Sequence, residues 1–147
     1  MTKSATKSAT ELSQPSLTPG HTFESFDWRD VTVDGVDWAR EMDVTPKVTN
    51  SSGALQGGLV ATLMDTVAGL SLLHGEDPYQ RCATSEMQIS FLDGARTGPV
   101  RAEAYVLRRG YRSAVVRVDV YDVGADDLHV ATATLSFWVK PRPTGRA

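Results

Sequence analysis

The chain has 147 residues, 41% of them hydrophobic, and a formal net charge of -3. This length and composition suit one domain with a single core. The charge balance excludes a strong basic field, so neither nucleic acid nor an anionic membrane is expected as a partner. The single cysteine, Cys82, excludes an internal disulfide framework. It fits a reducing, cytoplasmic compartment, where such a residue is usually a small buried hydrophobe.

The N-terminal segment, residues 1–22, is rich in Ser, Thr and Lys and lacks the apolar stretch of a secretory signal. We expect it to form a disordered leader, followed by one domain at residues 23–140 and a flexible tail at residues 141–147. Between residues 23 and 50, alternating stretches broken by Gly35 and Pro46 predict one or two strands.

A long apolar run from Leu55 to Leu73 predicts a helix that begins near Gln56 and ends near His74, just before a glycine. The run is about as long as a membrane span. A central aspartate, Asp65, would be costly in a bilayer, so a helix wrapped by its own sheet is favoured.

Asp65 is the only charged residue in this run. An isolated carboxylate in an apolar helix is costly unless another group pairs with it or uses it. Gly57 and Gly58 at the helix start can offer free backbone N–H groups to a developing oxyanion. About 12 Å of axial rise separates Asp65 from Gly57. The alternatives are a carboxylate satisfied by nearby hydroxyls and glycines that only allow close packing.

After Pro78 the hydrophobic period changes to two, which is typical of strands. In residues 82–92 the alternation places Ala83, Met87 and Ile89 on one face and Thr84 on the other, which predicts a half-buried strand. Further alternating segments predict strands at residues 100–106, 114–120 and 131–139. Their short connections predict that all four strands are sequential antiparallel neighbours.

One long helix between an N-terminal strand region and four long strands predicts an α+β fold, with an antiparallel sheet curled around the helix. An open sheet edge would remain, so we expect a homodimer, with a dimer of dimers, a homotetramer, as the further possibility. His21, His74 and His129 show no metal-site spacing, and no metal is expected.

The order of elements and the run from Asn50 through Leu55-Gln-Gly-Gly-Leu-Val-Ala-Thr-Leu-Met-Asp to Gly69 resemble the hotdog-fold acyl-CoA thioesterases, specifically the phenylacetate-pathway and 4-hydroxybenzoyl-CoA thioesterase group. A basic hairpin followed by an alternating valine strand, from Val106 to Asp122, is similar to the same group. The resemblance covers about residues 40–140. It implies a hotdog fold and a cofactor-free hydrolase that converts an acyl- or aryl-CoA to free acid and CoA.

The resemblance also implies roles for individual residues. Asn50 would orient water, the Gly57 amide would hold the oxyanion, and Asp65 would attack the thioester or activate water. Thr84 would present its hydroxyl to the carboxylate. The family usually has histidine where Gln56 stands, and glutamine can donate a hydrogen bond but cannot titrate near neutral pH. In these proteins the carboxylate and the glycine amide come from different subunits.

Arg108, Arg109 and Arg112 lie in the basic hairpin and suit the phosphates of coenzyme A, with a solvated turn as the alternative. Gly58 is expected to contact the substrate. The alternative function is a non-catalytic acyl-CoA-binding or regulatory hotdog protein, which Gln56 leaves open. A hydratase of this fold would need a histidine acting with an acid at the helix, and the sequence has none there.

Overall fold

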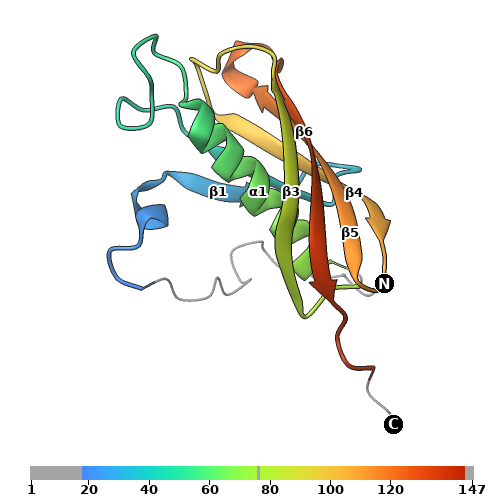
Figure 1. Ribbon diagram of the computed structural model, residues 1–147. Helices are drawn as coiled ribbons and strands as arrows, with labels where there is room; N and C mark the ends of the chain where they lie inside the picture. Colours follow the sequence, from blue (N-terminus) through green and yellow to red (C-terminus); the bar gives the residue numbers. More distant parts are fainter. Residues whose placement is uncertain (1–17, 76, 145–147) are drawn as a thin grey trace, which may run out of the picture.

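The computed structural model describes residues 18–75 and 77–144 and shows one α-helix lying along one face of a six-stranded antiparallel sheet (Figure 1). The main elements are β1 (Trp28–Val31), β2 (Trp38–Met42), α1 (Gly57–Leu73), β3 (Arg81–Phe91), β4 (Val100–Arg109), β5 (Ser113–Asp122) and β6 (Leu128–Lys140), with short 3-10 helices η2 (Thr22–Ser25) and η3 (Val123–Ala125). The predicted α+β architecture is confirmed. Most of the predicted leader and the end of the predicted tail lie outside the described residues.

The predicted bounds of the helix are confirmed, since Gln56 is its N-cap residue and His74 its C-cap residue. The chain leaves the helix through Gly75, whose φ of +101° is in the left-handed region that favours glycine. The backbone N–H of His74 then donates to the Leu70 carbonyl at 3.0 Å. Within the described part of the chain, no helix is long and apolar enough to cross a membrane.

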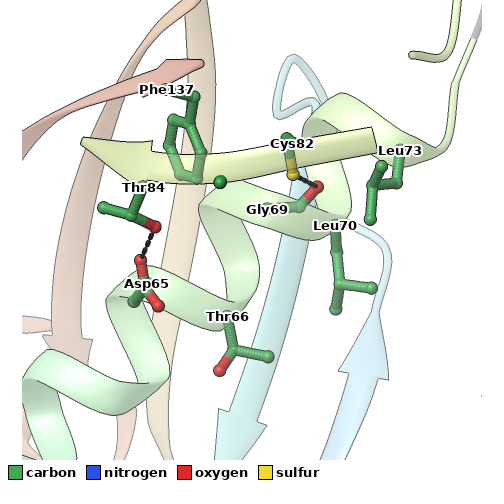
Figure 2. A pocket seen from close by; sticks show the side chains of 9 residues that line it. Asp65, Thr66, Gly69, Leu70, Leu73, Cys82, Thr84 and Phe137 are labelled. Carbon is green, nitrogen blue, oxygen red and sulfur yellow. Dashed lines mark hydrogen bonds between the residues drawn. The ribbon is translucent and has the colours of Figure 1, made fainter. Parts of the chain in front are cut away.

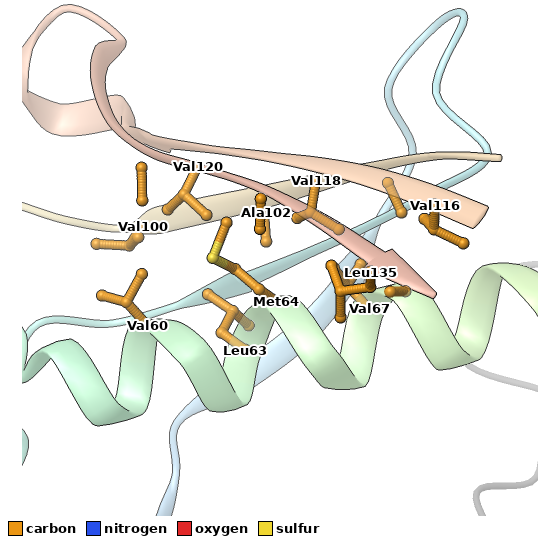
Figure 3. Packing of buried hydrophobic residues seen from close by; sticks show 14 of the residues in the cluster. Val60, Leu63, Met64, Val67, Val100, Ala102, Val116, Val118, Val120 and Leu135 are labelled. Carbon is orange, nitrogen blue, oxygen red and sulfur yellow. The ribbon is translucent and has the colours of Figure 1, made fainter. Parts of the chain in front are cut away.

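The core lies between one face of α1 and the inner face of the sheet. Figure 3 shows side chains of α1 pointing at a valine-rich surface of the strands. The labelled residues are Val60, Leu63, Met64 and Val67 on α1 and Val100, Ala102, Val116, Val118, Val120 and Leu135 on the strands, and none is more than 2% exposed. Burial of each such Val, Leu or Met side chain stabilises the folded state by about 1.5–3 kcal/mol. The opposite face of α1, which carries Asp65, is only half-buried.

The strand order is β1-β2-β4-β5-β6-β3. The predicted neighbours β4, β5 and β6 are confirmed, but the prediction that β3 lies beside β4 is wrong, because β3 pairs with β6. The other side of β4 is occupied by β2, and β3 lies at the far end of the meander that β4, β5 and β6 form. Residues 92–99 therefore cross from one side of the meander to the other, and β3 becomes an edge strand.

This crossover is held by the carboxylate of Asp122, which is 1% exposed. It accepts hydrogen bonds from the backbone N–H groups of Arg96 at 2.9 Å, Thr97 at 3.0 Å and Gly98 at 2.7 Å. These three charge-assisted hydrogen bonds satisfy backbone N–H groups that lie outside the strands and so have no strand partner. Asp122 thereby fixes the path of the chain between β3 and β4.

A bulge in β3 changes the predicted alternation of its side chains. The pairing register with β6 shifts between Thr84 and Glu86, so one extra residue is inserted. Thr84 opposes Phe137 while Met87 opposes Leu135, and both of these partners are buried core residues. The prediction that Thr84 and Met87 lie on opposite faces is therefore wrong, and Thr84 faces the helix.

Replacing Asp122 with Ala should lower the free energy of unfolding by about 3 kcal/mol, because three backbone donors of the crossover lose their acceptor. Urea denaturation followed by circular dichroism measures the change. Asp34→Ala, at an exposed carboxylate between β1 and β2, is the control and should alter stability by less than about 0.5 kcal/mol. Equal unfolding midpoints for both variants would contradict the assigned role of Asp122.

Candidate active site

The centre of the candidate site is a hydrogen bond between α1 and β3. The Thr84 hydroxyl donates to Oδ1 of Asp65 over 2.6 Å (Figure 2). Among the described residues, no donor contacts the second carboxylate oxygen, Oδ2. The pair therefore holds the carboxylate in one orientation and leaves one oxygen for another group.

Beside Asp65 lies a pocket of about 280 Å³ between α1 and β3. It is lined by Asp65, Thr66, Gly69, Leu70, Leu73, Cys82, Ala83, Thr84 and Phe137. Cys82 is only half-buried and faces this pocket (Figure 2), so the expectation of a buried cysteine is wrong. Burial raises the pKa of its thiol, and the negative charge of Asp65 raises it further.

Sequence reasoning did not identify Cys82, Leu73 or Phe137 as pocket residues. The helical spacing of four between Asp65, Gly69 and Leu73 was the available signal, since residues so spaced share a helix face. Cys82 and Phe137 could not be placed in this way, because their position depends on the pairing of β3 with β6. The described residues contain no group of three or more His, Cys, Asp or Glu side chains able to hold a metal ion.

The N-terminus of α1 presents the backbone N–H groups of Gly57 and Gly58. No acceptor in the described part of the chain contacts either group, and Gln56 provides no side-chain cap. A Cβ built on Gly57 would lie 3.5 Å from the ring of Phe91, an ordinary van der Waals contact. Close packing therefore does not require glycine here, and the two amides remain available to an anion.

Two polar side chains precede the helix. Nε2 of Gln56 donates a long hydrogen bond of 3.4 Å to the Thr49 carbonyl. Oδ1 of Asn50 accepts from the Ser52 N–H at 3.0 Å, the Ser52 hydroxyl at 2.9 Å and the Ala54 N–H at 3.2 Å. The Asn50 oxygen thus stabilises its own turn. Its amide group is the part that could contact water.

The structure places the predicted catalytic residues in two groups, of which the first is the pair of Thr84 and Asp65. Asn50, Gln56 and Gly57 lie at the N-terminal end of α1, whereas Asp65 lies about 12 Å further along the helix axis. A single chain therefore does not bring the glycine amide and the carboxylate to one reacting group.

The three arginines of the hairpin differ in their surroundings. Arg109 donates to the carbonyls of Asp77 at 2.9 Å and Ser71 at 3.1 Å, which ties the hairpin to the C-terminal end of α1. Arg108 and Arg112 are exposed, as Arg109 also is. The guanidinium of Arg109 is thus already engaged by the protein, and Arg108 and Arg112 are better placed to meet a phosphate.

Comparison with known proteins gives a consistent family. Residues 52–128, more than half of the chain, match the family model described as "Thioesterase superfamily". The chain is 31% identical over 100 residues to a predicted esterase of Saccharolobus solfataricus, a match covering 66% of this chain and 71% of that protein. It is 35% identical over 81 residues to human acyl-coenzyme A thioesterase 13, covering 54% of this chain and 57% of the human protein.

Comparison with solved structures gives the same family. A phenylacetic acid degradation-related protein from Ralstonia eutropha superposes with a TM-score of 0.66 at 26% identity, covering 76% of this chain and 84% of that chain. A Bacillus halodurans protein crystallised with CoA gives a TM-score of 0.59 at 28% identity, covering 69% of this chain and 66% of that chain. These matches confirm the predicted hotdog fold and the predicted resemblance.

The position of Cys82 predicts how its labelling should depend on Asp65. Because the negative charge of Asp65 disfavours the thiolate, Asp65→Asn should lower the thiol pKa and speed labelling by N-ethylmaleimide severalfold at a fixed pH below 9. Stopped-flow or mass-spectrometric labelling across pH 7–10 measures this rate, with urea-unfolded protein as the reference thiol. An unchanged rate in the variant would mean that Asp65 and Cys82 do not share the pocket.

Proposed function

The chain belongs to the thioesterase superfamily, and we propose that it hydrolyses the thioester of an acyl- or aryl-CoA to the free acid and CoA. The observation that carries this proposal is the carboxylate of Asp65, held by Thr84 at the mouth of a mostly apolar pocket. The name of the human relative and the CoA bound to the Bacillus halodurans protein support acyl-CoA as the substrate.

Thioester hydrolysis needs an attacking oxygen and stabilisation of the carbonyl oxygen. The Oδ2 atom of Asp65 either attacks the carbonyl carbon or takes a proton from a water that attacks it. The carbonyl oxygen becomes an oxyanion and is held by the Gly57 N–H, with Gly58 beside it. Collapse of the oxyanion breaks the C–S bond, and the CoA sulfur leaves as a thiolate that takes a proton from Asp65 in the water route or from solvent water in the direct route. In the direct route a water then hydrolyses the acyl–Asp65 anhydride and releases the free acid. Thr84 keeps Oδ1 fixed during these steps.

The polar residues before the helix align the participants. Gln56 donates its amide to the thioester or to water, and Asn50 offers its amide to the same water. Neither side chain titrates near neutral pH, so Asp65 is the only group of this set that can move a proton. Arg108 and Arg112 contact the CoA phosphates, with Arg109 holding their hairpin in place.

A homodimer supplies the missing proximity of Gly57 and Asp65. Strand β3 is an open edge along Arg81–Phe91, and unpaired edge groups favour pairing with a second copy. Phe91 and Leu92, 56% and 54% exposed, add an apolar surface at the end of this edge. Because Phe91 lies beside Gly57, the same interface covers the N-terminus of α1.

Two finer features belong to this proposal. The resemblance to the phenylacetate-pathway group supports pairing of dimers into a homotetramer, which sedimentation equilibrium would measure. A cytoplasmic location rests on the single cysteine, which suits a reducing compartment.

Replacing Asp65 with Asn should reduce thiol release from acyl-CoA by about a hundredfold or more, because the amide can neither attack nor accept the water proton. The measurement is release of CoA thiol from a panel of aryl, short-chain and long-chain acyl-CoAs, with folding checked by circular dichroism. Asp34→Asn, at an exposed carboxylate between β1 and β2, should retain wild-type turnover. Wild-type kcat in Asp65→Asn would refute the role of Asp65, whereas binding without any thiol release by wild type would favour the non-catalytic alternative.

A subunit-mixing experiment tests the shared site. Gly57→Pro removes the amide hydrogen at the first helical position, where proline is well tolerated, and Gln56 with φ -57° and ψ 135° suits a following proline. Gly57→Pro and Asp65→Asn should each be inactive when they are assembled alone. An equal mixture of these two variants, refolded together, should regain about a quarter of wild-type activity. Half of the dimers would contain one subunit of each variant, and each such dimer would carry one intact site of two. No recovery despite mixed dimers would place both groups in one subunit.

A further inference from the structure

The pocket beside Asp65 has a polar end and an apolar end. Asp65 and Thr84 form the polar end (Figure 2). From there the pocket follows the helix face one and two turns onward, past Gly69 to Leu73, with Leu70 beside them. Because the reacting carbonyl lies at Asp65, an apolar group attached to that carbonyl fits the other end.

Gly69 stands in the wall of this pocket, and no local demand explains a glycine there. It is not among the described glycines with positive φ. A Cβ built on it would lie 3.8 Å from Sγ of Cys82, an ordinary contact with no clash. Glycine in a helix interior is less stable than alanine. The Cys82 thiol donates a long hydrogen bond of 3.9 Å to the Gly69 carbonyl, so β3 already contacts the helix backbone here (Figure 2). The feature that depends on the missing side chain is the pocket wall beside this contact, toward Leu73.

The size of the pocket indicates which groups it can surround. A dry protein cavity of about 150 Å³ holds a benzene molecule. The pocket of about 280 Å³ is nearly twice as large. One aromatic ring on a short linker, or a short alkyl chain, fills such a space, whereas a long chain would extend beyond it. Cys82 and the ring of Phe137 supply soft apolar contacts for such a group.

We propose that Gly69 is the residue that determines acyl-group specificity: its missing side chain admits a compact acyl group, up to one ring on a short linker, between Cys82 and Leu73. This inference rests on the proposed thioesterase function. Larger side chains at position 69 narrow the pocket one helical turn beyond Asp65, so they should discriminate substrates by size while the Asp65–Thr84 hydrogen bond stays in place.

The kinetic test uses a graded series at position 69. Gly69→Ala should lower kcat/KM for phenylacetyl-CoA about tenfold and Gly69→Val about a hundredfold, while acetyl-CoA changes less than about threefold and serves as the internal control. Leu73→Ala should act in the opposite direction and raise kcat/KM for octanoyl-CoA. Equal losses for acetyl-CoA and phenylacetyl-CoA in both Gly69 variants would overturn the proposal, as would unchanged activity toward phenylacetyl-CoA.

A binding test separates this inference from catalysis, because Cys82 is the only cysteine and reports occupancy of the pocket. Neutral phenylacetamide should slow N-ethylmaleimide labelling of Cys82 in wild type but not in Gly69→Val, with each rate normalised to the same protein without ligand. Desulfo-CoA, which has no thiol to consume the reagent, should not slow the labelling of Cys82.

The outcomes distinguish the two proposals. Protection by desulfo-CoA instead of phenylacetamide would show that the pocket holds the pantetheine arm, which overturns the role of Gly69 and leaves the thioesterase function intact. Protection by phenylacetamide in a protein that hydrolyses no acyl-CoA would support the pocket assignment and refute the proposed function.

Discussion

The rotation of α1 about its own axis is the constraint on which the site depends. One face of the helix, including Leu63, Met64 and Val67, is sealed against the strands with no exposed surface. Burial worth about 1.5–3 kcal/mol per side chain leaves no alternative rotation of comparable stability. The residues on the other face of the helix, Asp65 and Gly69 among them, then face β3. The packing of the core thus determines where the only carboxylate of the helix points.

Strand β3 has two roles that follow from its place at the sheet edge. Its bulge turns Thr84 toward the helix, where the threonine hydroxyl donates to Asp65. Met87, beyond the bulge, lies on the same face of the sheet and packs over the core. The outer edge of β3 has no partner strand among the residues that the structure describes. A long unpaired edge favours association. The same strand therefore completes the carboxylate half of the site and offers the surface through which a second copy would supply the other half.

The helix also arranges charge along its length. Its N-terminus presents the Gly57 and Gly58 amides, which carry the positive end of the helix dipole toward an oxyanion. Its C-terminal end is contacted by Arg109, which donates to the Ser71 carbonyl and so satisfies a group left unpaired by the helix. Arg109 is better explained as an anchor between the hairpin and α1 than as a phosphate ligand. The chemistry of the site is thereby ordered along one axis, with Asp65 between the two ends.

The sequence alone determined the local elements, because their signals lie within one turn or one strand. The glycines and apolar periodicity around Gly57 and Gly75 defined the helix, and alternation defined β4, β5 and β6. The tertiary structure alone decided that β3 pairs with β6. Residues 92–99 can span about 26 Å when extended, and crossing three strand spacings needs about 14 Å, so chain length allowed either neighbour. The bulge that brings Thr84 to Asp65 likewise depends on pairing between distant strands, which no local period encodes.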